Sequence, residues 1–208
     1  MGEQFAARIH PKRVIKPGLN ILFPEVDGLR EKRIEKEINH SIAKKMHRMI
    51  EELGYGSESG LEIWGGYQVK LNESGVLGLR LEHFSQTEEG GRARLIVKPL
   101  NFDLKTGEIF KFEDLFKNDT DYASRINELI KSEIALKQIS LSTEFFGIFK
   151  RQSFYLAEAS LAIVFQPGEY TPESAEALEV EIAYEALIDL VYKNGPIARL
   201  LERRVLIS

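Results

Sequence analysis

The chain contains no cysteine among its 208 residues. This absence excludes disulfides, thiolate zinc sites, CxxC redox chemistry and a cysteine nucleophile. No run approaches the roughly 20 apolar residues that span a bilayer, and the N-terminus lacks the roughly 7 to 15 apolar residues of a signal peptide. As given, the sequence predicts a soluble, cytoplasmic protein without a transmembrane segment, and an extracytoplasmic one if a signal segment precedes it.

The common catalytic and cofactor motifs are also missing. GxSxG, HExxH and GxxxxGK[ST] do not occur in the sequence. His40 and His47 lie seven positions apart, whereas two zinc ligands on one helix need a spacing of about four. The glycine-rich residues 54–60 follow a helical pattern instead of a strand, which does not fit a nucleotide-binding loop. We therefore predict no metal or cofactor site and expect that the chain is not an enzyme.

Charge is distributed unevenly along the chain. Residues 1–53 hold 11 Lys/Arg and 8 Asp/Glu, whereas residues 154–192 hold 8 Asp/Glu and no Lys or Arg. The sequence pI of about 5.7 opposes binding to a polyanion, so no nucleic-acid partner is predicted. The acidic stretch instead favours a basic partner.

The rest of the composition is that of an ordinary globular protein, with 43% hydrophobic and 29% charged residues. A chain of this length can bury roughly 70% of its unfolded surface. We expect a single domain over residues 1–208, whose halves, residues 1–100 and 101–208, share a core.

Hydrophobic spacing predicts two main amphipathic helices. Apolar residues recur at threes and fours over residues 30–53, with Gly54 as the stop, and again over residues 120–138. A short helical stretch closes the chain after residue 185. Strands are predicted at residues 8–25 (two short ones), 67–84 (a hairpin), 95–102, 109–112, 154–156, 161–165 and 178–184, with residues 54–66 as a loop. The fold class is therefore α+β with a largely antiparallel sheet.

Two aromatic residues are candidates for ligand contact. Trp64 and Tyr67 flank Gly65-Gly66, and exposed aromatics beside glycine can stack on sugar rings or fill a pocket of a partner. The alternative is that they anchor the start of the hairpin to the core. His83 continues the apolar face of the hairpin, which favours a core histidine over a ligand or base.

The acidic candidates lie in the C-terminal half. Glu169, Glu173 and Glu176 cluster beside Tyr170, and paired carboxylates can do acid–base work. Glu179 and Glu181 alternate with apolar residues on a strand. These residues are candidates for binding a partner, but a charged loop and a solvated strand face explain the same pattern.

Several stretches in this order resemble one bacterial family. They read ILFPEVDGL at residues 21–29, NFDLKTGE at 101–108, DLF at 114–116 and LAIVFQPGEYTP at 161–172. They resemble the domain of unknown function in the extracytoplasmic part of lysozyme-sensing, RsiV-type anti-sigma factors. A similar domain precedes the catalytic module of some peptidoglycan deacetylases. The resemblance spans roughly residues 8–190 and is closest to signal-less, bacillus-type relatives.

The resemblance implies an α+β fold and a role in binding proteins, with lysozyme as the ligand of the anti-sigma branch. The chain departs from the family at two places. Residues 90–93 read GGRA where the family has Gly-Gly-Ala-His, and residues 173–177 read ESAEA where the family has tyrosines and glycine. The chain therefore lacks, at these places, the residues for roles tied to that histidine or those tyrosines. From the residues given, we also expect no membrane segment, no sigma-binding region and no deacetylase module.

We therefore expect a non-catalytic, envelope-related binding module that binds a basic, lysozyme-like protein or a cell-wall glycan. Two alternatives stay open. One is a hydrolase that uses the carboxylates of residues 169–176. The other is a structural protein that self-associates through a strand edge or through residues 197–207, so that the chain is a monomer or a weak homodimer.

Overall fold

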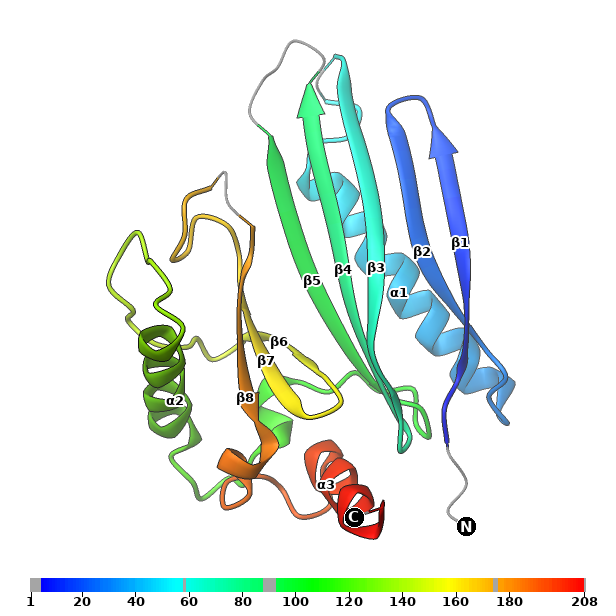
Figure 1. Cartoon of the computed structure of the whole chain (residues 1–208). Coiled ribbons are helices and arrows are strands. Elements are labelled where there is room, and N and C mark those ends of the chain that lie inside the picture. The colour runs from blue at the N-terminus through cyan, green and yellow to red at the C-terminus, as the bar shows by residue number, and fades with distance from the viewer. Residues whose placement is uncertain (1–4, 58, 88–92, 174–175, 208) are drawn as a thin grey trace.

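The computed structural model describes residues 5–57, 59–87, 93–173 and 176–207, with side chains up to residue 202. It contains a five-stranded sheet and a three-stranded sheet (Figure 1). Helix α1 (Lys32–Glu52) covers one face of the larger sheet, and the smaller sheet lies against the other face near β5 (Arg94–Asp103). This arrangement confirms the predicted α+β class.

The larger sheet has the strand order β1-β2-β3-β4-β5. Its other strands are β1 (Arg8–Lys16), β2 (Leu19–Asp27), β3 (Leu61–Glu73) and β4 (Val76–Thr87). Neighbours are antiparallel except β2 and β3, which are parallel because α1 intervenes between them. The β3–β4 hairpin turns at Ser74 and Gly75, which both have positive φ, as a two-residue hairpin loop requires.

Helix α1 forms where the hydrophobic spacing predicts it. Its apolar side chains lie about one turn apart, so they share one face and are buried together. Gly54, with φ +87°, follows Leu53, the C-cap residue of the helix. Against this face pack alternate residues of the sheet, including Leu77, Leu79 and Leu81 of β4. The predicted helix and hairpin are therefore held together by one core.

The smaller sheet is antiparallel, with strands β6 (Ser153–Leu156), β7 (Ser160–Phe165) and β8 (Leu178–Ala183) in that order. Helix α2 (Tyr122–Leu136) packs on its outer face, where Ile126 and Ile130 are buried. Two short 3-10 helices, η1 (Phe112–Leu115) and η2 (Tyr184–Leu187), and helix α3 (Pro196–Ile207) complete this half. Ile197 and Leu200 of α3 are buried in the same core.

Two local predictions were wrong. The loop expected over residues 54–66 ends at residue 60, because β3 begins at Leu61 and places Trp64 within a strand. Residues 109–112 do not form a strand. Ile109 makes one isolated bridge to Phe102, and η1 begins at Phe112. In both places local sequence could not show whether a neighbouring strand was available for pairing.

Two side-chain amides join the sheets. Asn101 on β5 donates from Nδ2 to the carbonyl of Phe154 (2.9 Å) and accepts from the N–H of Leu156 (2.8 Å). Gln166, just after β7, donates from Nε2 to the carbonyl of Val97 (2.7 Å) and accepts from its N–H (3.0 Å). Each amide therefore takes the place of a neighbouring strand. It forms hydrogen bonds with backbone N–H and carbonyl groups at a sheet edge, which would otherwise be unpaired.

Replacing Gln166 by alanine is expected to lower the free energy of unfolding by about 1 to 2 kcal/mol, because the Val97 N–H and carbonyl lose both partners. Urea denaturation measures this change. Gln86→Ala, at an exposed position of β4, is the matched control and is expected to change stability by less than about 0.5 kcal/mol. Equal effects of the two substitutions would show that the amide does not join the sheets.

Candidate binding site

Trp64 and Tyr67, the two aromatic candidates, lie on opposite faces of the larger sheet. Side chains alternate between the faces of a strand, so positions three apart point in opposite directions. Tyr67 packs half-buried against the α1 core, and burial raises the pKa of its hydroxyl. Trp64 faces away from α1 and is 40% exposed. The two aromatics therefore cannot contact the same ligand.

The two glycines between them also face opposite ways. A Cβ on Gly65 would lie 2.5 Å from His83 Cδ2 and 2.7 Å from Ile21 Cδ1, so the α1 core leaves no room for a side chain there. A Cβ on Gly66 would meet only Glu82 Oε1, at 3.9 Å. Gly66 thus leaves the sheet surface open beside Trp64.

An open pocket of about 620 Å³ lies over this surface. Trp64 and Phe84, on neighbouring strands, form its aromatic side, with ring centroids 6.0 Å apart and planes inclined at 31°. Glu176 reaches the pocket from the segment before β8. Structure thus brings together two candidates, Trp64 and Glu176, that are far apart in the sequence. The remaining lining residues are Gly65, Gly66, Gln68, Arg80, Glu82 and Leu95.

Arg80 in this pocket is held between carboxylates of both sheets. Its Nε donates to Glu179 Oε1 (2.5 Å), and its guanidinium also pairs with Glu82. Burial acts to lower the pKa of Arg80, but the hydrogen bonds to the two carboxylates outweigh burial and raise it. The Tyr155 hydroxyl donates to the other Glu179 oxygen (2.6 Å). Burial, reinforced by that bond, raises the pKa of Tyr155.

The two glutamates of β8 therefore have different surroundings. Glu179 is half-buried and bonded to Arg80 and Tyr155, so it is not part of a solvated strand face. Glu181 is exposed and accepts a hydrogen bond from Ser160 (3.1 Å). Only Glu181 of this pair presents its carboxylate to solvent, whereas Glu179 links the sheets.

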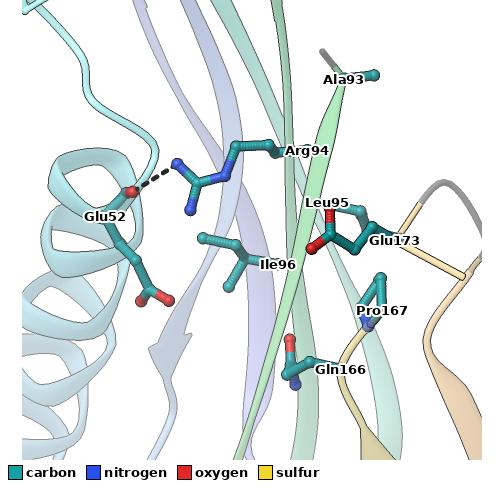
Figure 2. A pocket seen from close by; sticks show the side chains of 8 residues that line it. All are labelled: Glu52, Ala93, Arg94, Leu95, Ile96, Gln166, Pro167 and Glu173. Carbon is teal, nitrogen blue, oxygen red and sulfur yellow. Dashed lines mark hydrogen bonds between the residues drawn. The ribbon is translucent and has the colours of Figure 1, made fainter. Parts of the chain in front are cut away.

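A second pocket, of about 370 Å³, lies at the outer edge of β5 (Figure 2). Arg94 donates from Nη1 to the carbonyl of Glu52 at the end of α1 (3.1 Å). Glu173 lines this pocket from the β7–β8 connection, with Gln166 and Pro167 nearby. Leu95 lines both pockets, so the edge of β5 separates them.

The acidic cluster predicted from sequence is thus divided. Glu173 lines the pocket of Figure 2, whereas Glu176 lines the pocket of Trp64. Glu169 is exposed, and partial desolvation raises the pKa of its carboxyl. Tyr170 is 2% exposed and donates to the carbonyl of Gly147 (3.0 Å), which makes it a core residue.

His83 lies in the α1 core, as its place on the apolar face of β4 predicts. It is 2% exposed, and burial lowers its pKa to about 4. In the described part of the chain, its Nδ1 has no hydrogen-bond partner. Its imidazole is therefore neutral at neutral pH.

Among residues 5–57, 59–87, 93–173 and 176–207, no group of three or more acidic or histidine side chains could hold a metal ion. Within these ranges no helix has the length and apolarity to cross a bilayer. The family departure at residues 90–93 lies outside the described residues except for Ala93.

Sequence reasoning missed Gln68, Arg80, Glu82 and Phe84 as site residues. A signal was present, since Arg80 and Glu82 alternate with the buried leucines of β4 and must face away from α1. Nothing local showed that β8 and its preceding segment lie opposite them. The missing information was the packing of the two sheets.

The molecule is thus an α+β protein in which the smaller sheet packs against one face of the larger sheet and an open pocket lies over that face. A family model described as "Protein of unknown function (DUF3298)" matches residues 113–185, which is less than half of the chain. The match includes the DLF motif and residues 161–172 but not residues 101–108. The RsiV-type assignment stays a prediction.

Two solved structures share the fold. A DUF3298 family member from Bacteroides fragilis has a TM-score of 0.69 and 16% identity, and the alignment covers 96% of this chain and 100% of that one. A DUF3298 family protein from Pseudomonas aeruginosa has a TM-score of 0.66 and 12% identity, with 94% and 96% covered. No curated protein matches the chain. Identities this low establish a common fold only.

Proposed function

We propose that the chain is a non-catalytic binding module that takes a cell-wall glycan in the pocket of Trp64. The observation that carries this proposal is the aromatic pair of the exposed Trp64 and the half-buried Phe84 beside the open surface at Gly66. A pyranose ring has an apolar C–H face that packs on an aromatic ring and a polar edge that needs hydrogen-bond partners. The pocket offers both kinds of surface.

The polar partners surround the aromatic pair. Gln68, Glu82 and Glu176 line the same pocket, and amide and carboxylate oxygens can accept from sugar hydroxyl or acetamido groups. The carboxylates also disfavour a polyanion such as nucleic acid. Because Glu173 and Glu176 face different pockets, the proposal includes no step of acid–base catalysis.

The single tryptophan of the chain provides a direct test. Adding N-acetylglucosamine oligosaccharides or soluble peptidoglycan fragments is expected to change Trp64 fluorescence, because the sugar would exclude water from the indole. Calorimetry then gives the affinity of variants. Trp64→Ala is expected to weaken binding at least about tenfold, which corresponds to about 1.4 kcal/mol of lost contact.

Two further variants make the test specific to one face of the sheet. Gly66→Val places a side chain on the pocket surface and is expected to weaken binding while keeping Trp64. Tyr67→Phe, on the opposite face, is the control and is expected to bind as the unmodified chain does. Unchanged fluorescence and no heat at saturating glycan would falsify the proposal.

A basic protein is a second candidate ligand. Glu176 and Glu181 are exposed, and residues 154–192 contain no Lys or Arg. The resemblance to RsiV-type domains also supports a lysozyme-like partner. Titration with lysozyme is expected to show binding that weakens from low to moderate salt and in a Glu176→Gln/Glu181→Gln variant. Absence of binding at low salt would remove this candidate.

A further inference from the structure

The segment after α2 presents two phenylalanines to solvent. Phe146 is 79% exposed and Phe149 is 61% exposed, whereas Phe145 is buried in the core and Ile148 packs against it. The segment therefore has an inner apolar side and an outer apolar side. We call residues 145–151 the aromatic loop.

Specific hydrogen bonds fix the conformation of the aromatic loop. Gly147 has φ +122°, and its carbonyl accepts from the buried Tyr170 hydroxyl (3.0 Å). Asn127 Oδ1 on α2 accepts from the N–H of Ile148 (2.9 Å). Gln152 Oε1 accepts from the N–H of Phe149 (3.1 Å). These hydrogen bonds fix the backbone of the loop, and the backbone in turn directs the two phenylalanine side chains outward.

The glycine is needed for this conformation. A Cβ at Gly147 would lie 2.9 Å from Asn127 Nδ2, and the positive φ is strained for other residues. Local structure therefore holds Phe145 inward and Phe146 outward at consecutive positions. Exposing two large aromatic side chains three positions apart on one loop is unfavourable in water and indicates a contact surface.

The charges beside the phenylalanines indicate what kind of surface they contact. Lys150 and Arg151 follow Phe149 directly and are exposed. Residues 141–152 contain one acidic residue, Glu144. Exposed aromatics flanked by basic side chains fit the boundary of an anionic bilayer, where rings enter the headgroup region and cations contact phosphates.

We propose that the aromatic loop binds the surface of an anionic lipid bilayer, with Phe146 and Phe149 inserted at the headgroup level and Lys150 and Arg151 on lipid phosphates. The proposal is independent of the glycan pocket. Helix α2 and the loop that follows it lie on the side of the smaller sheet away from the larger sheet (Figure 1), whereas Trp64 lies on the larger sheet.

Co-sedimentation of the full chain with vesicles tests the proposal. Binding is expected to vesicles that contain phosphatidylglycerol, at least tenfold more weakly to pure phosphatidylcholine, and more weakly as salt is raised. Phe146→Ser/Phe149→Ser and, separately, Lys150→Glu/Arg151→Glu are each expected to reduce binding at least tenfold. Ile15→Ser removes another exposed apolar side chain, at a position on β1, and is expected to leave binding unchanged.

An inserted probe reports the depth of the loop. With Trp64 replaced by phenylalanine, Phe149→Trp becomes the single indole, and its emission is expected to shift to the blue on addition of anionic vesicles only. Equal binding to both lipid types, retained binding by the Phe146→Ser/Phe149→Ser variant, or no binding at low salt would each overturn the proposal. So would a dimer seen by light scattering that this variant abolishes, because the loop would then contact a second copy.

Discussion

Replacing Gly78 by alanine is expected to lower the free energy of unfolding by about 3 kcal/mol, at the upper end of the cost of overpacking a core. Gly78 lies on β4 and faces the smaller sheet, and a Cβ there would lie 2.4 Å from the carbonyl oxygen of Leu156 on β6. That oxygen belongs to backbone, which cannot turn aside as a flexible side chain does. The sheets must separate, which also weakens the Asn101 bonds to β6.

Gly66→Ala is the matched control for Gly78→Ala. Both glycines lie on the same face of the larger sheet, but a Cβ on Gly66 has no atom closer than 3.9 Å. Gly66→Ala is expected to raise the free energy of unfolding by up to about 1 kcal/mol, because alanine loses less backbone entropy on folding than glycine does. Urea unfolding followed by circular dichroism measures both. Equal stability of the two variants would contradict this account of the close approach.

Acidification is expected to destabilise the fold through His83, by up to about 3 kcal/mol once the pH has fallen from 6.5 to 4. Burial lowers the pKa of His83 from 6.5 to about 4, so the unfolded chain binds a proton in this range more readily than the folded chain does. The contribution of His83 is complete above pH 6.5 and is lost as pH falls toward 4.

His83→Leu is expected to remove this part of the pH dependence, because leucine carries no proton in either state. Stability measured by urea at several pH values tests it. His40→Gln, at an exposed position of α1, is the control and is expected to keep the dependence. If the free energy of unfolding of His83→Leu still falls between pH 6.5 and 4 as it does in the unmodified chain, another group is responsible for the pH dependence.

The carboxylates act in a lower pH range. The backbone N–H of Gly28, followed by Lys32, lowers the pKa of Asp27 from 3.8 to about 2. Its contribution to stability is present above pH 3.8 and is lost as pH falls toward 2. Most of the loss from His83 falls between pH 6.5 and 4, and most of the loss from Asp27 falls between pH 3.8 and 2. The two losses overlap only near pH 4, and the His83→Leu variant separates them there.

Local sequence was sufficient where a periodic pattern and its packing partner lie close in the chain. Helix α1 was predicted because its apolar residues repeat at helical spacing. The hairpin was predicted because Gly75 ends a run of alternating residues. The buried position of His83 followed from the same alternation. Each of these features depends on a period that neighbouring residues display.

Alternation along β3 would also have separated Trp64 from Tyr67, but only if residues 61–66 had been assigned to a strand. Their glycines indicated a loop instead. Gly65 is present because His83 and Ile21 occupy the space of its side chain. A glycine required by packing and a glycine required by a turn look the same in one sequence, and only a neighbouring strand distinguishes them.

By itself, the sequence determined the fold class, the main helices, the central hairpin and the absence of thiol chemistry. Only the tertiary structure decided which side chains share a site. Glu179 meets Arg80 across 99 positions of sequence and Gln166 meets Val97 across 69, while Glu176 joins Trp64 in one pocket. These contacts depend on how two sheets, each stabilised by its own helix, pack against each other. That packing is set by Gly78 and by amide–backbone bonds that leave no periodic pattern in the chain.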